Sequence, residues 1–287
     1  MKKIFLVLMC FFMATSIAFA QTTDMTAPIN PDPHVKIGKL ANGMTYYIRH
    51  NEYPKNVVEL RLATNAGSNQ ENEDQRGLAH FTEHMAFNGI EGFPGNTMVE
   101  QLQKIGVVFG ADLNAYTSFD ETVFMIPMPL TDTNNLNIGL KILRGWAHGL
   151  IYDDKEIDAE RGVISEEYRM GLGASDRMQK KYWPVLMSGS RYADRVPIGL
   201  LDVIQHFKYQ TIKDFYHDWY RPDLQAIIVV GDIDVNGVEA KIKSMFGNIP
   251  AVQNPRVKEQ YPIAPNKEPL ISICTDKEAM GSQVMII

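Results

Sequence analysis

The residues of this chain with the clearest chemistry are His80-Phe81-Thr82-Glu83-His84. On a helix that turns about 100° per residue, His80 and His84 lie about 40° apart and one turn from each other. Both imidazoles can therefore bind one metal ion from the same side. Glu83 falls about 60° away on the other flank of His80, close enough to act on a water molecule at the ion. Zinc suits this set, because it accepts imidazole nitrogen and carboxylate oxygen and leaves one position for water in catalytic sites.

The residues around this motif predict a buried helix. Leu78, Phe81 and Met85 form one apolar stripe, and Ala79 and Ala86 form another. Burying two imidazoles and a carboxylate in one sector of such a helix carries a large desolvation cost. Neighbouring side chains could satisfy the histidines instead, but a metal ion compensates the cost directly. We therefore favour a metal site.

Two histidines need a third protein ligand to hold zinc tightly. The segment Asp153–Met170 predicts an acidic helix that offers Glu156, Glu160, Glu166 and Glu167. Glu160 and Glu167 share a face but lie two turns, about 10.5 Å, apart, so we expect one ion to take only one of them directly. For each glutamate a solvated helix face is the alternative, and spacing alone does not choose among them.

Three strands are predicted before the motif helix. Val35–Leu40 and Met44–Arg49 flank Asn42-Gly43, a dipeptide that favours a two-residue hairpin turn. Val57–Ala66 has alternating apolar positions. An acidic loop follows, and its carboxylates would favour the positive end of the motif helix. We expect Asn88-Gly89 to end that helix.

The rest of the chain mixes helices with strands. Strands are predicted at Ala111–Ser118, Thr122–Met128 and Ala226–Val230, and helices at Thr97–Ile105, Asn135–Leu150, Asp153–Met170, Leu200–Phe207 and Ile212–Tyr220. We expect capping boxes at Thr97 and Asp153 to open two of these helices. Strands come first and helices then lie between further strands, so the pattern favours an α+β fold, an antiparallel sheet packed against helices.

Residues 1–20 are typical of a secretory signal peptide. Lys2 and Lys3 precede the apolar run Ile4–Phe12, and Ala18-Phe19-Ala20 matches a cleavage site before Gln21. A membrane anchor is the alternative, but the run falls short of the roughly 20 apolar residues that a span needs. The sequence therefore predicts an exported protein, periplasmic or extracellular, with no membrane span after cleavage.

The net charge and the two cysteines of the chain limit its binding partners and its possible disulfides. The net charge of −6 becomes −8 without the two lysines of the signal, so no basic footprint for nucleic acid or an anionic membrane is present. Cys10 lies inside the apolar run, where a lipoprotein signal is disfavoured, and Cys274 is then the single cysteine of the mature chain. An intrachain disulfide is excluded, and stability must come from a hydrophobic core.

The motif and a second element together resemble a known family. His80-x-x-Glu83-His84 followed by Glu160-Arg161-Gly162-Val163-Ile164-Ser165-Glu166-Glu167 is similar to the pitrilysin/insulinase family of zinc metallopeptidases, the inverzincins, which includes the mitochondrial processing peptidases. The resemblance spans roughly residues 35–250. Further agreement is found at Leu40-Ala41-Asn42-Gly43, Gly77-Leu78-Ala79-His80, Asn114-Ala115-Tyr116-Thr117, Tyr220-Arg221-Pro222 and Val230-Gly231-Asp232. The loop from Asn88 to Asn96 departs from the family pattern.

This resemblance implies a mitochondrial processing peptidase-like metallohydrolase domain with zinc endopeptidase activity on extended peptides. It implies that Glu83 acts as the base, that Glu160 is the third zinc ligand and that Glu167 supports the site without binding the ion. It also implies that a peptide substrate lies along the edge of a strand, with Asn114 and Ala115 nearest the metal. An ordinary polar residue at a strand end is the alternative for Asn114.

The resemblance also bears on domain organisation. We expect a linker at 21–34, a catalytic domain at 35–250, a second linker at 251–268 and, at 269–287, the start of a second domain truncated from a longer chain. Enzymes of the family are built from two similar halves, so we expect a C-terminal half or a homologous subunit as partner. A non-catalytic or incomplete subunit is the alternative function. A metal-dependent lyase of the S-ribosylhomocysteine type also carries H-x-x-E-H, but a signal peptide argues against it.

Overall fold

The hairpin predicted around Asn42 and Gly43 forms, but Leu40 pairs with Met44, so its turn has three residues rather than the two expected. In the computed structural model, which describes residues 28–287, β1 (Lys36–Lys39) pairs antiparallel with β2 (Thr45–His50). Gly43 has a φ of +98°, a conformation that favours glycine. The predicted signal peptide and residues 21–27 of the first predicted linker lie outside the described residues.

Six strands form one mixed sheet in the order β1-β2-β8-β3-β7-β6. The four further strands are β3 (Val57–Thr64), β6 (Asn114–Thr117), β7 (Thr122–Pro129) and β8 (Gln225–Gly231). The α+β fold is confirmed, but β2 and β8 pair in parallel, so the sheet is not purely antiparallel. A parallel pair needs a long crossover connection, and the helices between β2 and β8 supply one.

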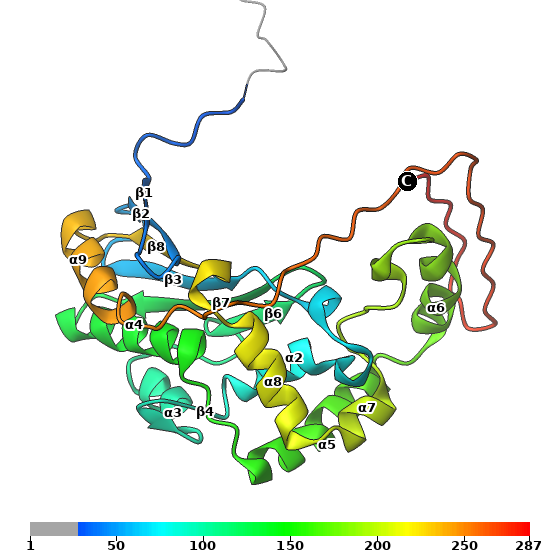
Figure 1. Cartoon of the computed structure of the whole chain (residues 1–287), viewed down its shortest axis with the longest axis horizontal. Helices are drawn as coiled ribbons and strands as arrows, with labels where there is room; N and C mark the ends of the chain where they lie inside the picture. The colour runs from blue at the N-terminus through cyan, green and yellow to red at the C-terminus, as the bar shows by residue number, and fades with distance from the viewer. Residues whose placement is uncertain (1–27) are drawn as a thin grey trace, which may run out of the picture. The chain divides into compact units, whose positions relative to one another are not determined.

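One face of the sheet carries the main core. Side chains of β3 alternate between buried and more accessible positions, with Val58, Leu60 and Leu62 fully buried. Helix α4 (Thr133–His148) packs against β3 and β7, and α9 (Val235–Phe246) packs against β2. Figure 1 shows α4, α2 and α8 on the same side of the sheet.

The motif helix α2 (Leu78–Met85) is buried between the sheet and a helical layer. Its stripe of Leu78, Phe81 and Met85 joins a second apolar cluster with residues of α5 (Asp154–Met170), α7 (Leu201–His206) and α8 (Tyr209–Trp219). The other stripe, Ala79 and Ala86, belongs to the main core. The predicted buried helix is therefore confirmed, and both of its apolar faces are occupied.

The remaining elements are short or were not predicted. They are η1 (Ser68–Gln70), η2 (Glu73–Gln75), β4 (Gly89–Ile90), β5 (Phe93–Pro94), α3 (Thr97–Lys104), α6 (Ala174–Leu186), η3 (Arg191–Ala193) and η4 (Pro222–Leu224). The sequence did not predict α6 or α9. Asp153 caps α5 as expected, because its side chain accepts hydrogen bonds from the amides of Lys155 and Glu156. Thr97 was expected to cap α3, but Asn96 occupies that position and Thr97 is the first residue of the helix.

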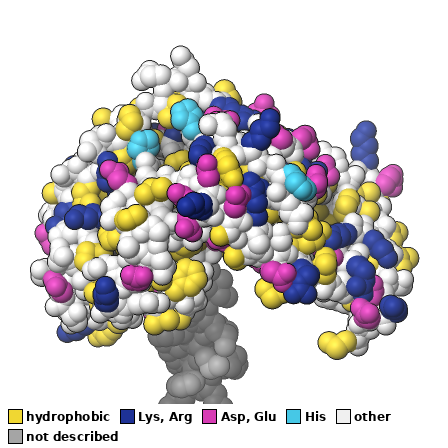
Figure 2. Space-filling view, turned by 90° about the horizontal axis from the view of Figure 1, so that it is seen from below, with side chains coloured by type: hydrophobic (Ala, Val, Ile, Leu, Met, Phe, Trp, Pro, Cys, Tyr) yellow, Lys and Arg dark blue, Asp and Glu magenta, His cyan; other side chains and the backbone are white. Residues whose placement is uncertain are grey.

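The C-terminal segment differs from expectation. Residues 251–287, all of which the structure describes, form no helix or strand. The start of a second domain was expected at 269–287, and this segment pairs with none of the described strands. None of the described helices is long and apolar enough to cross a bilayer. Figure 2 shows charged side chains of both signs interspersed over the face in view.

Candidate metal centre

Two helices bring three metal-binding side chains together. The Nε2 atoms of His80 and His84 lie 3.2 Å apart, one turn from each other on α2. From α5, Glu167 places its Oε2 3.7 Å from His80 Nε2 and 3.5 Å from His84 Nε2. All three donor atoms lie within 4.8 Å of one another.

These distances fit a zinc ion. Zinc–ligand bonds of about 2.0–2.2 Å in tetrahedral geometry separate neighbouring donors by roughly 3.3–3.6 Å. The three observed separations, 3.2, 3.5 and 3.7 Å, lie close to that range. Two imidazole nitrogens and a carboxylate oxygen are also a usual zinc donor set.

Glu160 occupies a different place from the one expected. Its Oε1 lies 2.7 Å from His84 Nδ1, and its Oε2 accepts a hydrogen bond of 2.6 Å from Asn88. Because Nδ1 and Nε2 lie at different edges of the ring, a proton donated from Nδ1 to Glu160 leaves the Nε2 lone pair for a metal. The sequence expectation placed Glu160 at the ion and Glu167 behind it. The geometry favours the reverse, because the later turn of α5 faces the two Nε2 atoms.

The two histidines have different electrostatic surroundings. Burial, together with the neighbouring His84, lowers the pKa of His80 to about 4, although Glu160 opposes the shift. Burial also acts to lower the pKa of His84, but the hydrogen bond to Glu160 and the nearby carboxylates outweigh it and raise that pKa. A neutral His80 has an Nε2 lone pair available for a metal ion.

Glu83 is held beside the two histidines by a residue that the sequence analysis did not assign. Thr117 on β6 donates a hydrogen bond of 2.6 Å to Glu83 Oε2. Glu83 is 8% exposed, and burial raises the pKa of its carboxyl although the bond from Thr117 opposes the shift. The contact joins residues far apart in sequence, so spacing gave no signal for it. Asn88, which holds Glu160, was likewise read only as the end of the helix.

A cavity of about 400 Å³ opens beside the two histidines and Glu167. It is lined by His80, Glu83, His84, Glu167, Ala115, Tyr116, Thr117, Pro197 and Ile198. Of the two expected substrate residues, Ala115 lines this cavity, whereas the exposed Asn114 is not among the lining residues and accepts a hydrogen bond from the Ala115 amide. Within the described residues β6 pairs with β7 alone, so its other edge is open to the cavity side.

The wall formed by Pro197 and Ile198 was also missed by the sequence analysis. This segment is pinned to the start of α2, where a Cβ built on Gly199 would lie 2.3 Å from the Cα of Gly77. Both glycines have positive φ, +72° and +107°. The Leu200 amide also donates to the carbonyl of Arg76. Two glycines thus permit the close approach that sets this wall beside the metal centre.

A buried carboxylate caps the metal-binding helix. Glu71 is fully buried, and its Oε1 accepts a hydrogen bond of 2.8 Å from the amide of Ala79. Burial raises the pKa of Glu71 to about 8, although the amide bond and the nearby Arg195 and Arg76 oppose the shift. The acidic loop before α2 was expected to stabilise the start of this helix through its negative charge. Glu71 instead contacts the first turn of the helix directly, through its hydrogen bond with the amide of Ala79.

Two family profiles match this chain. The profile of the Insulinase (Peptidase family M16) domain matches residues 46–178. The profile of the Peptidase M16 inactive domain matches residues 206–287. The chain belongs to the M16 peptidase family. The resemblance stated from the sequence is therefore confirmed.

Individual relatives of this M16 chain are much longer than it is. The chain is 41% identical over 212 residues to the probable zinc protease PqqL of Haemophilus influenzae, a match that covers 74% of this chain and 23% of the relative. It is 37% identical over 250 residues to the zinc protease PQQL-like of Arabidopsis thaliana, covering 87% of this chain and 26% of the relative. The chain thus spans about a quarter of the length of these relatives.

A solved structure gives the same result for the fold. The crystal structure of the first half of the periplasmic protease PqqL from Escherichia coli matches with a TM-score of 0.78 and 38% identity. The match covers 83% of this chain and 51% of that one. The described domain therefore has the M16 peptidase fold.

Proposed function

We propose that this chain carries the zinc-binding and catalytic residues of an M16 endopeptidase that hydrolyses extended peptides. The observation that carries the proposal is the convergence of His80 Nε2, His84 Nε2 and Glu167 Oε2 within 4.8 Å, with Glu83 beside them. His80, His84 and Glu167 would hold the zinc ion. When bound, zinc supplies a Lewis acid that polarises the scissile carbonyl and activates water for attack.

Glu83 acts as the general base in this proposal. Its carboxylate is oriented by Thr117 and lines the same cavity as the metal ligands. Glu83 takes a proton from the attacking water and returns a proton to the leaving amine. Burial raises the pKa of its carboxyl above the ordinary value, and a raised pKa favours return of the proton to the leaving amine.

The substrate would bind as an extra strand on the open edge of β6. Main-chain hydrogen bonds along Asn114–Thr117 would position the peptide while tolerating varied side chains. Ala115 lines the cavity and would lie against the peptide near the scissile bond. Asn114, which lies on the same edge strand, would contact the peptide further from the metal.

We further propose that the protein is exported and that this chain alone is not sufficient for full activity. The amino-terminal pattern at residues 1–20 supports export, and a relative with this fold is described as a periplasmic protease. Because the chain spans about a quarter of its relatives' length, we propose that full activity requires a C-terminal half of the same protein or a homologous subunit. An incomplete subunit without activity of its own is the second candidate function.

The test is Glu83→Gln, with Glu166→Gln as the matched control. Both are single carboxylate-to-amide changes, but Glu166 is exposed and bonds to Arg169 away from the cavity. Hydrolysis of an internally quenched peptide should fall by about 10²–10⁴-fold in Glu83→Gln. Zinc content should stay unchanged, and Glu166→Gln should match the wild type. The assay uses the protein extended to the length of its relatives. Wild-type turnover by Glu83→Gln would reject the role of Glu83.

A further inference from the structure

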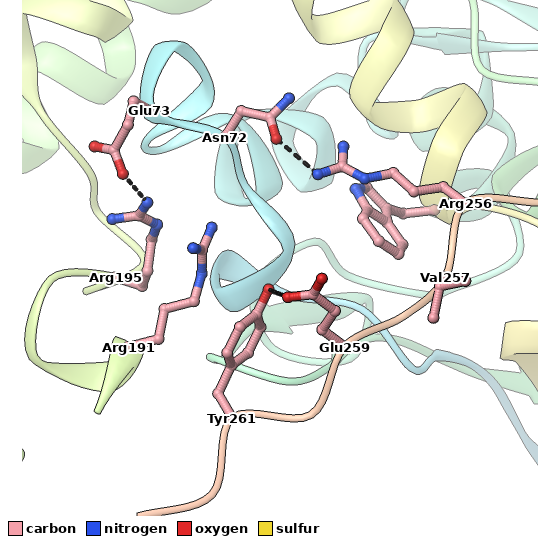
Figure 3. A pocket seen from close by; sticks show the side chains of 9 residues that line it. Asn72, Glu73, Arg191, Arg195, Arg256, Val257, Glu259 and Tyr261 are labelled. Atoms are coloured by element: carbon pink, nitrogen blue, oxygen red, sulfur yellow. Dashed lines mark hydrogen bonds and ion pairs between the residues drawn. The ribbon is translucent and has the colours of Figure 1, made fainter. Parts of the chain in front are cut away.

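A second hollow lies between the loop before α2, the segment around η3 and the C-terminal segment. Its volume is about 290 Å³, and its lining residues differ from those of the metal centre. Three arginines, Arg191, Arg195 and Arg256, line it together with Trp219 and Tyr261. Figure 3 shows Arg191 and Arg195 on one side of the hollow and Arg256 on the other.

Two buried donors in this lining have no acceptor. Trp219 is 2% exposed and Arg195 is 3% exposed. Trp219 Nε1 and Arg195 Nε have no hydrogen-bond partner among residues 28–287. Indole and guanidinium nitrogens donate only, so an acceptor atom must satisfy them. A buried donor without a partner is rare enough in native proteins to indicate a missing ligand or water.

The other cations of the hollow are held in place by the protein itself. Arg191 donates to the carbonyl oxygens of Asn69 and Glu71, and its guanidinium lies 4.8 Å from the ring centre of Tyr261. Arg256 donates to Asn72 and to Asp218. A guanidinium has five N–H donors, so fixed arginines of this kind retain further donors for a ligand.

The acids of the lining are fewer than the cations. Glu73 pairs with Arg195, and Glu259 accepts a hydrogen bond of 3.1 Å from the Tyr261 hydroxyl. The lining therefore holds three guanidinium groups and two carboxylates, and a third carboxylate, Asp218, pairs with Arg256 from outside the lining. N–H donors outnumber acceptors in this lining, which selects an anionic acceptor over a cation or an apolar ligand.

We propose that this hollow binds a small oxyanion, a carboxylate or a phosphate-type group, through Trp219 Nε1 and the guanidinium groups of Arg191, Arg195 and Arg256. Planar guanidinium groups match both kinds of anion, since both present paired oxygens. The hollow is large enough for a small organic acid as well as for inorganic phosphate.

Binding here would tie together two parts of the molecule. Arg256 belongs to the segment after α9, and Arg191 holds two carbonyls of the loop that carries Glu71. Glu71 in turn caps α2 next to His80. A bound anion would therefore hold the C-terminal segment against the domain and stabilise the loop at the start of the metal-binding helix.

Calorimetry with inorganic phosphate, sulfate, malonate and citrate tests the proposal, with chloride at equal ionic strength as reference. The wild-type chain should bind at least one of them with a dissociation constant of about 1 mM or tighter. The phosphate and sulfate arms separate a phosphate-type ligand from an organic carboxylate. Neither this measurement nor its outcome depends on peptide hydrolysis.

Trp219→Phe is the sharpest variant, because it keeps an aromatic ring and removes the unpaired N–H. It should weaken anion binding by about tenfold, the effect of one lost hydrogen bond to a charged group. Trp183→Phe is the matched control, since Trp183 donates to the carbonyl of Tyr192 and is not among the lining residues. It should leave binding unchanged.

Arg256→Gln provides a second variant at a partly exposed position, should Trp219→Phe fail to fold. It should also weaken binding. Absence of saturable binding by all four anions would overturn the proposal and leave water as the occupant of the hollow. Binding that is unchanged in both Trp219→Phe and Arg256→Gln would overturn it as well.

Discussion

At the metal centre, each of two functional side chains is held by a partner from another element. Glu160, itself held by Asn88, fixes one edge of the His84 ring, and Thr117 fixes the carboxylate of Glu83. His80 differs, because its buried Nδ1 has no hydrogen-bond partner among residues 28–287. In the described structure the Nδ1 edge of the His80 ring is therefore held by packing, whereas a hydrogen bond to Glu160 holds the Nδ1 edge of the His84 ring.

Thr117→Val should slow peptide hydrolysis by about tenfold without loss of zinc, because it removes the hydrogen bond that orients the Glu83 carboxylate. Steady-state kinetics and metal analysis of the same preparation measure both effects. Thr122→Val is the matched control, since Thr122 donates to the carbonyl of Ala66 instead. Equal rates for Thr117→Val and the wild type would show that Thr117 does not orient Glu83.

At the level of elements, α2 depends on its surroundings for stability. An isolated helix of eight residues is marginal in water, so tertiary contacts must hold it. Glu71 caps its first turn, and Trp146 donates a hydrogen bond of 3.0 Å to the carbonyl of Ala86 at its end. The close contact between Gly77 and Gly199 holds the segment that forms the cavity wall against the start of α2.

Glu71→Gln should reduce the dependence of stability on pH. Burial raises the pKa of Glu71 from 4.5 to about 8, against the effect of Arg195 and Arg76. The folded protein therefore retains a proton that the unfolded chain releases in this range, and stability should fall as pH rises between these two values. Urea unfolding across this range measures the slope, with Glu52→Gln at an exposed loop position as control. An unchanged slope in Glu71→Gln would show that Glu71 does not titrate in this way.

At the scale of the whole molecule, the C-terminal segment, residues 251–287, forms no helix or strand and exposes much of its apolar surface. Its apolar side chains are exposed, including Ile271, Ile273, Val284, Ile286 and Ile287. It is anchored to α6 through Arg177, which bonds to Asp276 and Glu278 at 2.7 and 2.6 Å. An exposed apolar segment of this kind is prone to association.

Residues 21–287 alone should bind zinc but cleave peptides poorly. Loss of one preorganised transition-state donor typically costs about 10²–10³ in rate, and the proposed C-terminal half would supply such donors. Activity should rise when that half is added in trans or joined in the same chain. Turnover by residues 21–287 as a monomer at the rate of the longer protein would contradict the requirement for a second half.

Elements with local signals could be predicted from the sequence. The hairpin followed from Asn42-Gly43, the start of α5 from Asp153, and the burial of α2 from its two apolar stripes. The parallel pairing of β2 with β8 could not be predicted, because it depends on how the intervening helices return the chain. Helix α6 buries no residue fully and contains Pro184, a residue that disfavours the interior of a helix.

The candidate site could likewise be predicted only where its residues follow a local pattern. His80, Glu83 and His84 lie on one helix, so their relative positions could be derived from their spacing in the sequence. The choice between Glu160 and Glu167 depends on the rotation and height of α5 against α2, which no local pattern encodes. Thr117 and Ile198 reach the cavity only through long-range packing.

Metal analysis of four proteins tests the central claim most directly: the wild-type chain, Glu167→Gln, Glu160→Gln and His84→Ala. We predict one zinc per wild-type chain and loss of zinc in both Glu167→Gln and His84→Ala. Glu160→Gln should still bind zinc, about 10–100-fold more weakly, because it loses only the support of His84. Zinc retained by Glu167→Gln and lost by Glu160→Gln would contradict the ligand assignment, and full zinc in His84→Ala would contradict the metal centre itself.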